Sequence, residues 1–137
     1  MNLKDQAKKY GVCDLEYSQE LKKLGCKQEG IWWWDLRENR VVIREEKWGA
    51  EEYISAPTAS ELWERLPFQV NDYDLWIIKH IDNKQWIVAY TKEAMRKTLK
   101  SFKDTLANAM TKMLIYLIKN KPIEAKWKNI LRQNRKQ

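Results

Sequence analysis

The stretch from Leu99 to Ile118 limits the choice of fold more than any other part of this chain. Its apolar residues recur at steps of three and four positions, which is the period of an amphipathic α-helix. Polar residues at 103, 104, 108 and 112 fall on the opposite side, and the last turns, 113–118, are apolar nearly all round. A helix of this kind is buried, and its apolar run is too short to span a bilayer. The stretch therefore predicts a core helix that other elements must cover.

Shorter patterns predict the other helices and strands. Thr58 and Glu61 have capping-box spacing, in which the hydroxyl accepts one backbone amide and the carboxylate another. Residues 75–81 and 85–90 flank Asp82-Asn83-Lys84 and form the clearest expected hairpin. At the N-terminus we expect a short helix or loose arm within 1–12 that ends at Gly11, and then a short helix from a Ser18 cap to Leu24. Strands are expected at 31–36 and 41–48, followed by an extended piece at 53–55, a short helix after Thr58, an extended piece at 68–70 and the hairpin. The chain is then expected to continue with a helical lead-in capped by Thr91, the main helix capped by Thr98 or Ser101, and a basic helix at 122–137.

The order of these elements predicts an α+β fold. Because most strands are joined by short connections, the sheet is expected to be largely antiparallel, with helices on one face. A chain of 137 residues has the length of one domain with one core. We therefore expect a single domain, residues 1–137, with an antiparallel sheet of about four to five strands packed against the long C-terminal helix and short additional helices.

Charge and cysteine content limit the class of protein. The net charge of +7 and the pI near 9.4 favour anionic partners, although a solvated basic surface without a partner gives the same composition. Cys13 and Cys26 are too few for a disulfide framework and lack the spacing of metal ligands. With no signal-peptide pattern at the start, we expect a cytoplasmic protein with reduced thiols.

Catalytic motifs are not found in the sequence. The one histidine, His80, falls in a strand pattern without a nucleophile in a recognisable arrangement, and a plain strand histidine explains it more simply. Glu45-Glu46 and Glu51-Glu52 are neighbours in sequence, so in a strand they point to opposite faces and form no two-carboxylate site. There is no glycine-rich phosphate loop. We therefore predict no enzyme activity, no metal site and no cofactor.

Binding chemistry is better represented, because aromatic and basic residues alternate on the two expected hairpins. Indole rings stack on nucleobases, and Arg or Lys neutralises phosphate. In a row of three Trp at 32–34, Trp33 faces away from its neighbours, so at least one indole is expected on the less buried side. The alternative is that these indoles only cover helices. The residues predicted to bind an anionic nucleotide, on one sheet, are Trp33, Arg40, Arg44, Trp48, Trp76, Lys79, His80 and Lys84.

The C-terminal segment offers a second candidate anion site. Its basic residues face a single acid, Glu124, and a basic helix can lie along a phosphate backbone. It could equally be a solvated tail, or dock on another subunit through Trp127 and Ile130. The residues predicted for nucleic-acid contact in this alternative are Lys121, Lys126, Lys128, Arg132 and Arg135.

Three segments resemble a widespread group of small phage and prophage proteins of unassigned function. They are YSQELKKLGCKQEGIWWW, ISAPTASELWERLP and DTLANAMTKMLIYLIKNK, which are similar to the group's SxxLKxLG, APTxSELxExLP and ALANAMxKMLIYLIxNK patterns. The resemblance spans roughly residues 17–121 and excludes the basic ending. It implies a phage context and a one-domain α+β fold, and it supplies no site residues.

A phage context changes the expected function, since small non-catalytic phage proteins often counter host defence. We expect a homo-oligomer that binds and sequesters a small nucleotide immune signal in the cytoplasm of the infected or lysogenic bacterium. One alternative is a nucleic-acid-binding accessory protein that uses the basic C-terminal helix. The other is an inhibitor that contacts a host defence protein directly. No membrane partner is expected.

Overall fold

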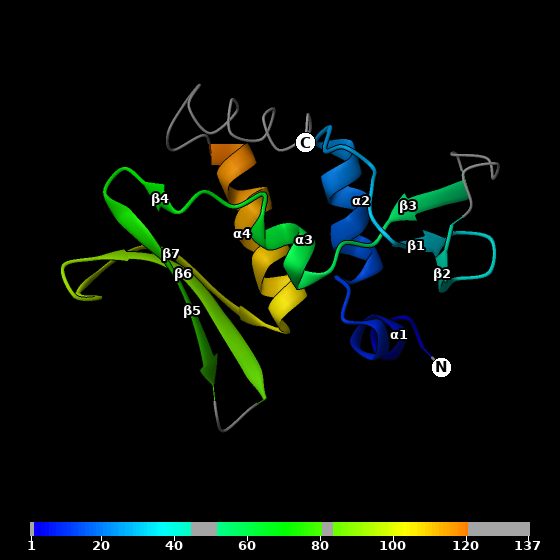
Figure 1. The fold of residues 1–137 in the computed structure, drawn as a ribbon, viewed down its shortest axis with the longest axis horizontal. Coiled ribbons are helices and arrows are strands. Elements are labelled where there is room, and N and C mark those ends of the chain that lie inside the picture. The colour runs from blue at the N-terminus through cyan, green and yellow to red at the C-terminus, as the bar shows by residue number, and fades with distance from the viewer. Residues whose placement is uncertain (1, 45–51, 81–83, 121–137) are drawn as a thin grey trace.

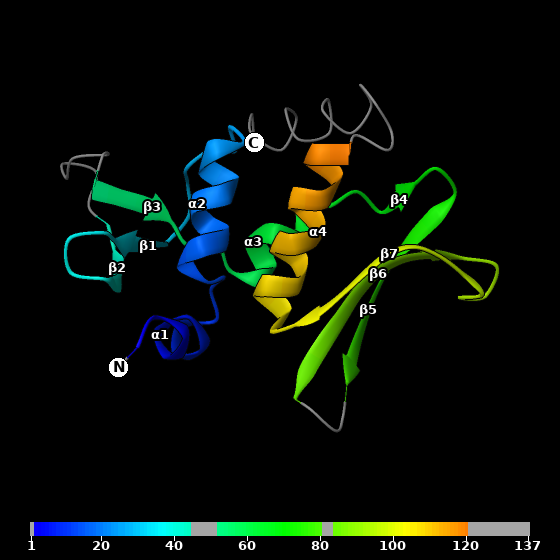
Figure 2. The same ribbon diagram turned by 180° about the vertical axis from the view of Figure 1, so that it is seen from behind.

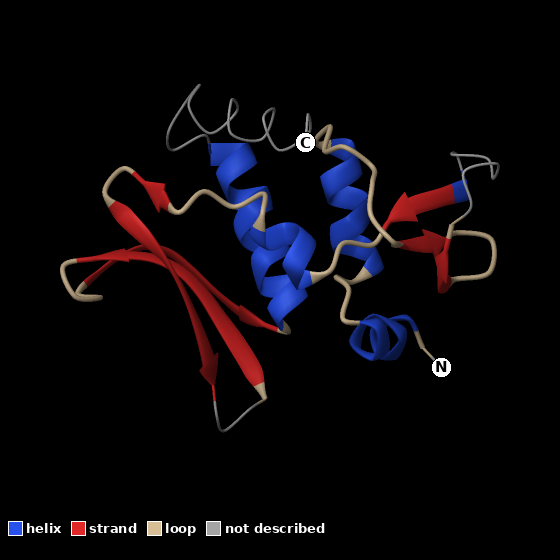
Figure 3. Cartoon of the chain, viewed as in Figure 1, coloured by secondary structure: helices blue, strands red, loops and turns tan. Residues whose placement is uncertain are grey.

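The computed structural model describes residues 2–44, 52–80 and 84–120. The predicted basic helix at 122–137, the second half of the predicted strand at 41–48 and part of the turn at 82–84 lie outside these residues. The described elements, shown in Figures 1 and 3, are α1 (Leu3–Tyr10), α2 (Leu15–Lys23), β1 (Trp32–Asp35), β2 (Arg40–Ile43), β3 (Tyr53–Ser55), α3 (Ala59–Trp63), β4 (Gln69–Val70), β5 (Tyr73–His80), β6 (Gln85–Lys92), β7 (Lys97–Asp104) and α4 (Leu106–Asn120).

The strands form two antiparallel sheets, with helices between them. The small sheet has the order β2-β1-β3, and the large sheet has the order β4-β5-β6-β7. Figure 1 shows α4, α3 and α2 as a layer that separates the two sheets, and Figure 2 shows the same arrangement from behind. The predicted α+β class, with an antiparallel sheet packed against the long C-terminal helix, is confirmed. The division of the strands into two sheets was not predicted.

The main hydrophobic core lies between α4 and one face of the large sheet. Buried residues of α4 such as Met113, Leu114 and Leu117 pack with Val88 and Tyr90 of β6. A second core lies under the small sheet, where Trp34, Val41 and Ile54 pack with α1. Among the described helices, none combines the length and apolar character that crossing a bilayer requires. At the apolar end of α4, Leu114 and Leu117 are buried in the main core.

The N-terminal segment is helical, which is one of the two alternatives expected for it. Gly11 ends α1 in the left-handed conformation (φ 64°), and its amide bonds to the carbonyls of Ala7 and Lys8. The predicted N-cap at Ser18 is wrong, because α2 begins after Asp14. Ser18 lies inside the helix, and its hydroxyl is buried 3.0 Å from the Cys13 sulfur. A small polar residue at this place serves packing and not capping.

The largest difference from the prediction is at the start of the core helix. Residues 97–104 form strand β7, and the helix begins only at Leu106. Thr105 Oγ1 accepts a hydrogen bond from the amide of Asn108 at 3.3 Å, so Thr105 caps the start of the helix, and the predicted caps at Thr98 or Ser101 are wrong. The predicted lead-in helix capped by Thr91 is also wrong, because Thr91 lies within β6.

The local turn chemistry was predicted more accurately. Thr58 and Glu61 form both hydrogen bonds of the expected capping box. Strands β5 and β6 pair as expected, from Asp74 opposite Thr91 to His80 opposite Gln85. A second hairpin joins β4 to β5 through Asn71-Asp72, both with positive φ, and it was not predicted although this residue pair suits such a turn.

Candidate ligand-binding surface

The structure divides the predicted nucleotide-binding residues between two sheets. Trp33, Arg40 and Arg44 belong to the small sheet and its end, whereas the predicted residues from 76 to 84 belong to the β5–β6 hairpin. Figure 1 places the two sheets on opposite sides of the helix layer. The prediction that these residues share one sheet is therefore wrong. Trp48 and the five basic residues predicted in the C-terminal segment lie outside the described residues.

Trp33 cannot serve as an open stacking platform. Its side chain is buried, with 7% of the residue surface exposed, and its indole Nε1 donates to the carbonyl of Gly30 at 3.0 Å. The guanidinium of Arg44 covers the ring, 4.7 Å from its centroid, and lies 6.0 Å from the ring of Tyr53. Stacking of this kind between a cation and an aromatic ring stabilises the small sheet itself. Trp33 and Arg44 therefore contact each other within the small sheet, and their role in ligand binding stays a prediction.

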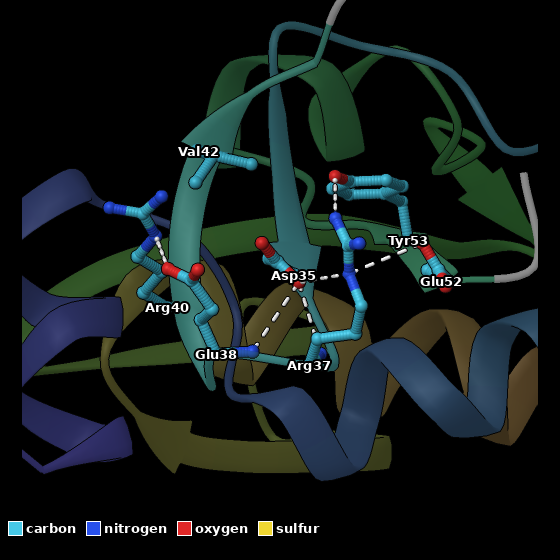
Figure 4. A pocket seen from close by; sticks show the side chains of 7 residues that line it. All are labelled: Asp35, Arg37, Glu38, Arg40, Val42, Glu52 and Tyr53. Atoms are coloured by element: carbon cyan, nitrogen blue, oxygen red, sulfur yellow. Dashed lines mark hydrogen bonds and ion pairs between the residues drawn. The ribbon is translucent and has the colours of Figure 1, made fainter. Parts of the chain in front are cut away.

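A charged pocket of about 370 Å³ lies on the same side of the small sheet (Figure 4). Arg37 lies in its centre, where its Nη2 donates to the Tyr53 hydroxyl at 2.9 Å and its Nε is 3.2 Å from Glu52 Oε2. Asp35 is buried and accepts the backbone amides of Arg37 and Glu38, so it fixes the turn between β1 and β2. These side chains mainly bind one another.

The charge of this pocket does not suit an anionic ligand. Three carboxylates and two guanidinium groups line it. The predicted ligand residue Arg40 has its Nε 2.9 Å from Glu38 Oε2, so that acid already compensates its charge. No group of three or more metal-ligating side chains occurs in the part of the chain that the structure describes. We therefore place the candidate site on the large sheet.

The candidate site is the side of the large sheet that faces away from α4, which we call the outer face. Residues alternate between the two sides of a strand. Val88, Tyr90 and Phe102 pack into the main core, so their neighbours in sequence lie on the outer face. The outer face consists of Asp74, Trp76, Ile78 and His80 of β5, Gln85, Ile87, Ala89 and Thr91 of β6, and Thr98, Ser101 and Lys103 of β7.

Trp76 is the most prominent feature of the outer face. It is 45% exposed, and in register it lies opposite Ala89, which in turn lies opposite Ser101. Two small residues thus extend from the indole to the edge of the sheet. Neither core cluster contains Trp76. Figures 1 and 2 show α4 on one side of this sheet and none of the described elements on the other.

Basic residues border this surface unevenly. Lys103 lies on the outer face opposite Ile87, and it is not among the predicted site residues because a helical period was assigned to this segment. The predicted Lys79 lies on the other side, opposite Trp86, with its Nζ 5.8 Å from the ring centroid. Lys84 is exposed where the chain enters β6. Of the predicted residues in this hairpin, only Trp76 and His80 therefore lie on the outer face.

Two buried polar atoms on the outer face have no hydrogen-bond partner among the described residues. They are Nδ1 of His80 and Oγ1 of Thr91. Thr91 is almost completely buried, with 3% of its surface exposed, although it lies on the side away from α4. An unsatisfied buried hydroxyl is uncommon and requires a physical explanation.

Comparison with protein-family models, with curated proteins and with solved structures finds no match to this chain.

Proposed function

We propose that this protein binds a small nucleotide on the outer face of the large sheet and holds it without changing it chemically. The observation that carries the proposal is Trp76, a half-exposed indole beside two small residues on a face that no described element covers. An indole in this position is suited to stack on a nucleobase, because every base has a π-face.

The dimensions of the outer face are compatible with such a ligand. Neighbouring strands are about 4.8 Å apart, so Trp76 on β5 and Ser101 on β7 are separated by about 10 Å across the sheet. A base stacked on Trp76 would direct its sugar over Ala89 and its phosphate towards β7. There the Ser101 hydroxyl can donate a hydrogen bond, and the Lys103 ammonium can neutralise phosphate charge. The net charge of +7 also attracts an anion over longer distances.

Sequestration is the biological role that fits such binding. The resemblance to small phage proteins implies a setting in which a host immune signal is a target. A protein that binds a signalling nucleotide and releases it slowly lowers its free concentration without catalysis. We therefore propose that the bound ligand belongs to the class of small nucleotide second messengers and that binding counters a host defence system.

Isothermal titration calorimetry with a panel of cyclic and ADP-ribose-type nucleotides tests the binding step. We expect heat with at least one nucleotide, and a loss of affinity of roughly 5- to 150-fold in Trp76→Ala, since base stacking is worth about 1–3 kcal/mol. Trp63→Ala is the matched control, because Trp63 is similarly exposed (42%) but lies on α3. Absence of heat with every nucleotide, or equal losses in both variants, would refute the proposal.

Recovery of the nucleotide tests whether binding is non-catalytic. After incubation with the protein, the bound ligand is released by denaturation and analysed by liquid chromatography and mass spectrometry. We expect it to be recovered intact in an amount that matches the binding sites. Progressive appearance of a hydrolysis product would show an enzyme and contradict sequestration.

A further inference from the structure

Thr91 carries a hydroxyl that makes no hydrogen bond within the part of the chain that the structure describes. In the centre of a sheet, valine has the same shape and an equally high strand propensity. The Thr91 hydroxyl is buried, yet it has no hydrogen-bond partner among the described residues. Burying such a group without a partner destabilises the native state.

The register places this hydroxyl close to the proposed stacking residue. Thr91 lies opposite Asp74 on β5, and Trp76 lies two residues further along β5 on the same side. Diagonal neighbours of this kind are about 7–8 Å apart, which is within reach of a large aromatic group. A base stacked on Trp76 would therefore have an edge near Thr91.

A threonine hydroxyl can donate one hydrogen bond and accept others, so it can pair with a carbonyl, an amino group or a ring nitrogen. Thr91 Oγ1 is buried when no ligand is bound. Contact with a ligand therefore requires a side chain of the outer face to turn aside. Trp76 is the large apolar side chain exposed on this face.

We propose that Thr91 recognises the base: its hydroxyl hydrogen-bonds the edge of a nucleobase that stacks on Trp76. This inference rests on the proposed function and narrows its ligand class. The ligand must carry a base with hydrogen-bonding groups on its edge. An anion without such an edge, whether a planar aromatic anion or a sugar phosphate, is expected to bind weakly. The missing partner of Thr91 is then supplied by the ligand.

The test compares Thr91→Val with wild type by calorimetry, using the four 5′-ribonucleoside monophosphates and ribose 5-phosphate as probes. We expect wild type to bind at least one nucleotide more tightly than ribose 5-phosphate. In Thr91→Val that preference should fall by about five- to tenfold, with the affinity for ribose 5-phosphate unchanged. Thr91→Ser keeps the hydroxyl and should retain the preference.

Ser60→Ala is the control, because Ser60 carries an exposed hydroxyl on α3, away from the outer face. It should bind as wild type does. Thermal unfolding checks the fold of each variant, and Thr91→Val should be at least as stable as wild type because an unsatisfied hydroxyl has been removed. If it does not fold, Thr91→Ala replaces it in the comparison with Thr91→Ser.

The two proposals fail in different ways. If wild type binds none of these nucleotides or those of the wider panel, the proposed function is wrong. If wild type binds a nucleotide and Thr91→Val binds it with the same preference, nucleotide binding stands and the role of Thr91 is wrong.

Discussion

Gln6 and Gln28 close the two opposite edges of the small sheet in the same way. Gln6 Oε1 accepts the amide of Val41 on β2 at 2.9 Å, and Gln28 Oε1 accepts the amide of Ser55 on β3 at 2.8 Å. Because β2 and β3 are the outer strands, both amides would otherwise be open to pairing with another chain. Two glutamine side chains from outside the sheet thus replace neighbouring strands.

Replacing Gln6 by alanine should therefore weaken the small sheet. The variant loses the bond to Val41 and the bond that Gln6 Nε2 donates to the Asn39 carbonyl at 3.2 Å. We expect the free energy of unfolding to fall by about 1 kcal/mol, measured by urea denaturation. Size-exclusion chromatography at increasing concentration should show more self-association, because the β2 edge is uncovered.

Gln19→Ala is the control, since Gln19 is an exposed glutamine on α2. Its stability and elution should match those of wild type. Equal behaviour of the Gln6 and Gln19 variants would mean that water replaces the Gln6 side chain without loss.

A second prediction concerns the ion pair that joins β7 to α4. Lys112 Nζ lies 2.6 Å from Asp104 Oδ2, and Asp104 also accepts from the side chain of Asn108. Burial alone would raise the pKa of Asp104, but hydrogen bonds from Lys112, from the Thr105 amide and from Asn108 outweigh it, so the pKa is lowered from its ordinary value of 3.8. A carboxyl with a lowered pKa stabilises the fold above that ordinary value, and the stabilisation disappears as the pH falls through the folded-state pKa.

Asp104→Asn should therefore be less stable than wild type at neutral pH, by about 1 kcal/mol, because it loses a charge-assisted bond. The difference should shrink as the pH falls below 3.8, where wild type also begins to lose the charge. Urea denaturation at several pH values measures it. Glu93→Gln, in an exposed pair with Lys97, should have little effect at any pH. If the difference in the free energy of unfolding between Asp104→Asn and wild type does not change with pH, this account is wrong.

The region around Asp104 also shows why the sequence was misleading here. Leu99 and Phe102 both pack against the main core, a spacing of three that resembles a helix. In a regular strand they would point to opposite sides. The register shift between Tyr90 and Thr91 adds one residue to β7, and both side chains then face α4. A bulge of this kind depends on pairing with β6, which local periodicity does not reveal.

The candidate site was predictable only in part. Alternation along β5 places Trp76 and His80 on one side and Lys79 on the other, and this part can be predicted because the period of a strand is a local property. The grouping of Trp33 with Trp76 failed, since which strands share a sheet is decided by pairing between distant segments. Lys103 and Thr91 are not among the predicted site residues, because their place also depends on pairing between distant segments. Their segments were assigned to helices, and only the register with β5 and β6 brings them to the outer face.

A third prediction concerns the reactivity of Cys13. The residue is fully buried, and burial raises the pKa of its thiol to about 11, against hydrogen bonds with Ser18 and Thr111 that lower it. The thiolate is the reactive form, so Cys13 should be nearly inert at neutral pH in the folded protein. In Cys26→Ser, which leaves Cys13 as the one thiol, reaction with Ellman's reagent should proceed only as fast as the protein unfolds. In urea it should be immediate, and fast labelling of the native protein would contradict the burial.

A fourth prediction concerns the turn between β6 and β7, where a substitution should raise the free energy of unfolding. Glu93, Ala94 and Met95 all have positive φ, at 55°, 56° and 68°. Residues other than glycine rarely adopt this backbone conformation. This conformation costs roughly 1–2 kcal/mol for a residue with a Cβ, and glycine adopts it freely but loses about 0.5–1 kcal/mol more conformational entropy on folding. Ala94→Gly should therefore raise the free energy of unfolding by about 0.5–1 kcal/mol. Ala59→Gly, the same change at the start of α3, should lower it by a similar amount. If both variants are destabilised in urea denaturation, the left-handed turn is not the conformation of residue 94 in solution.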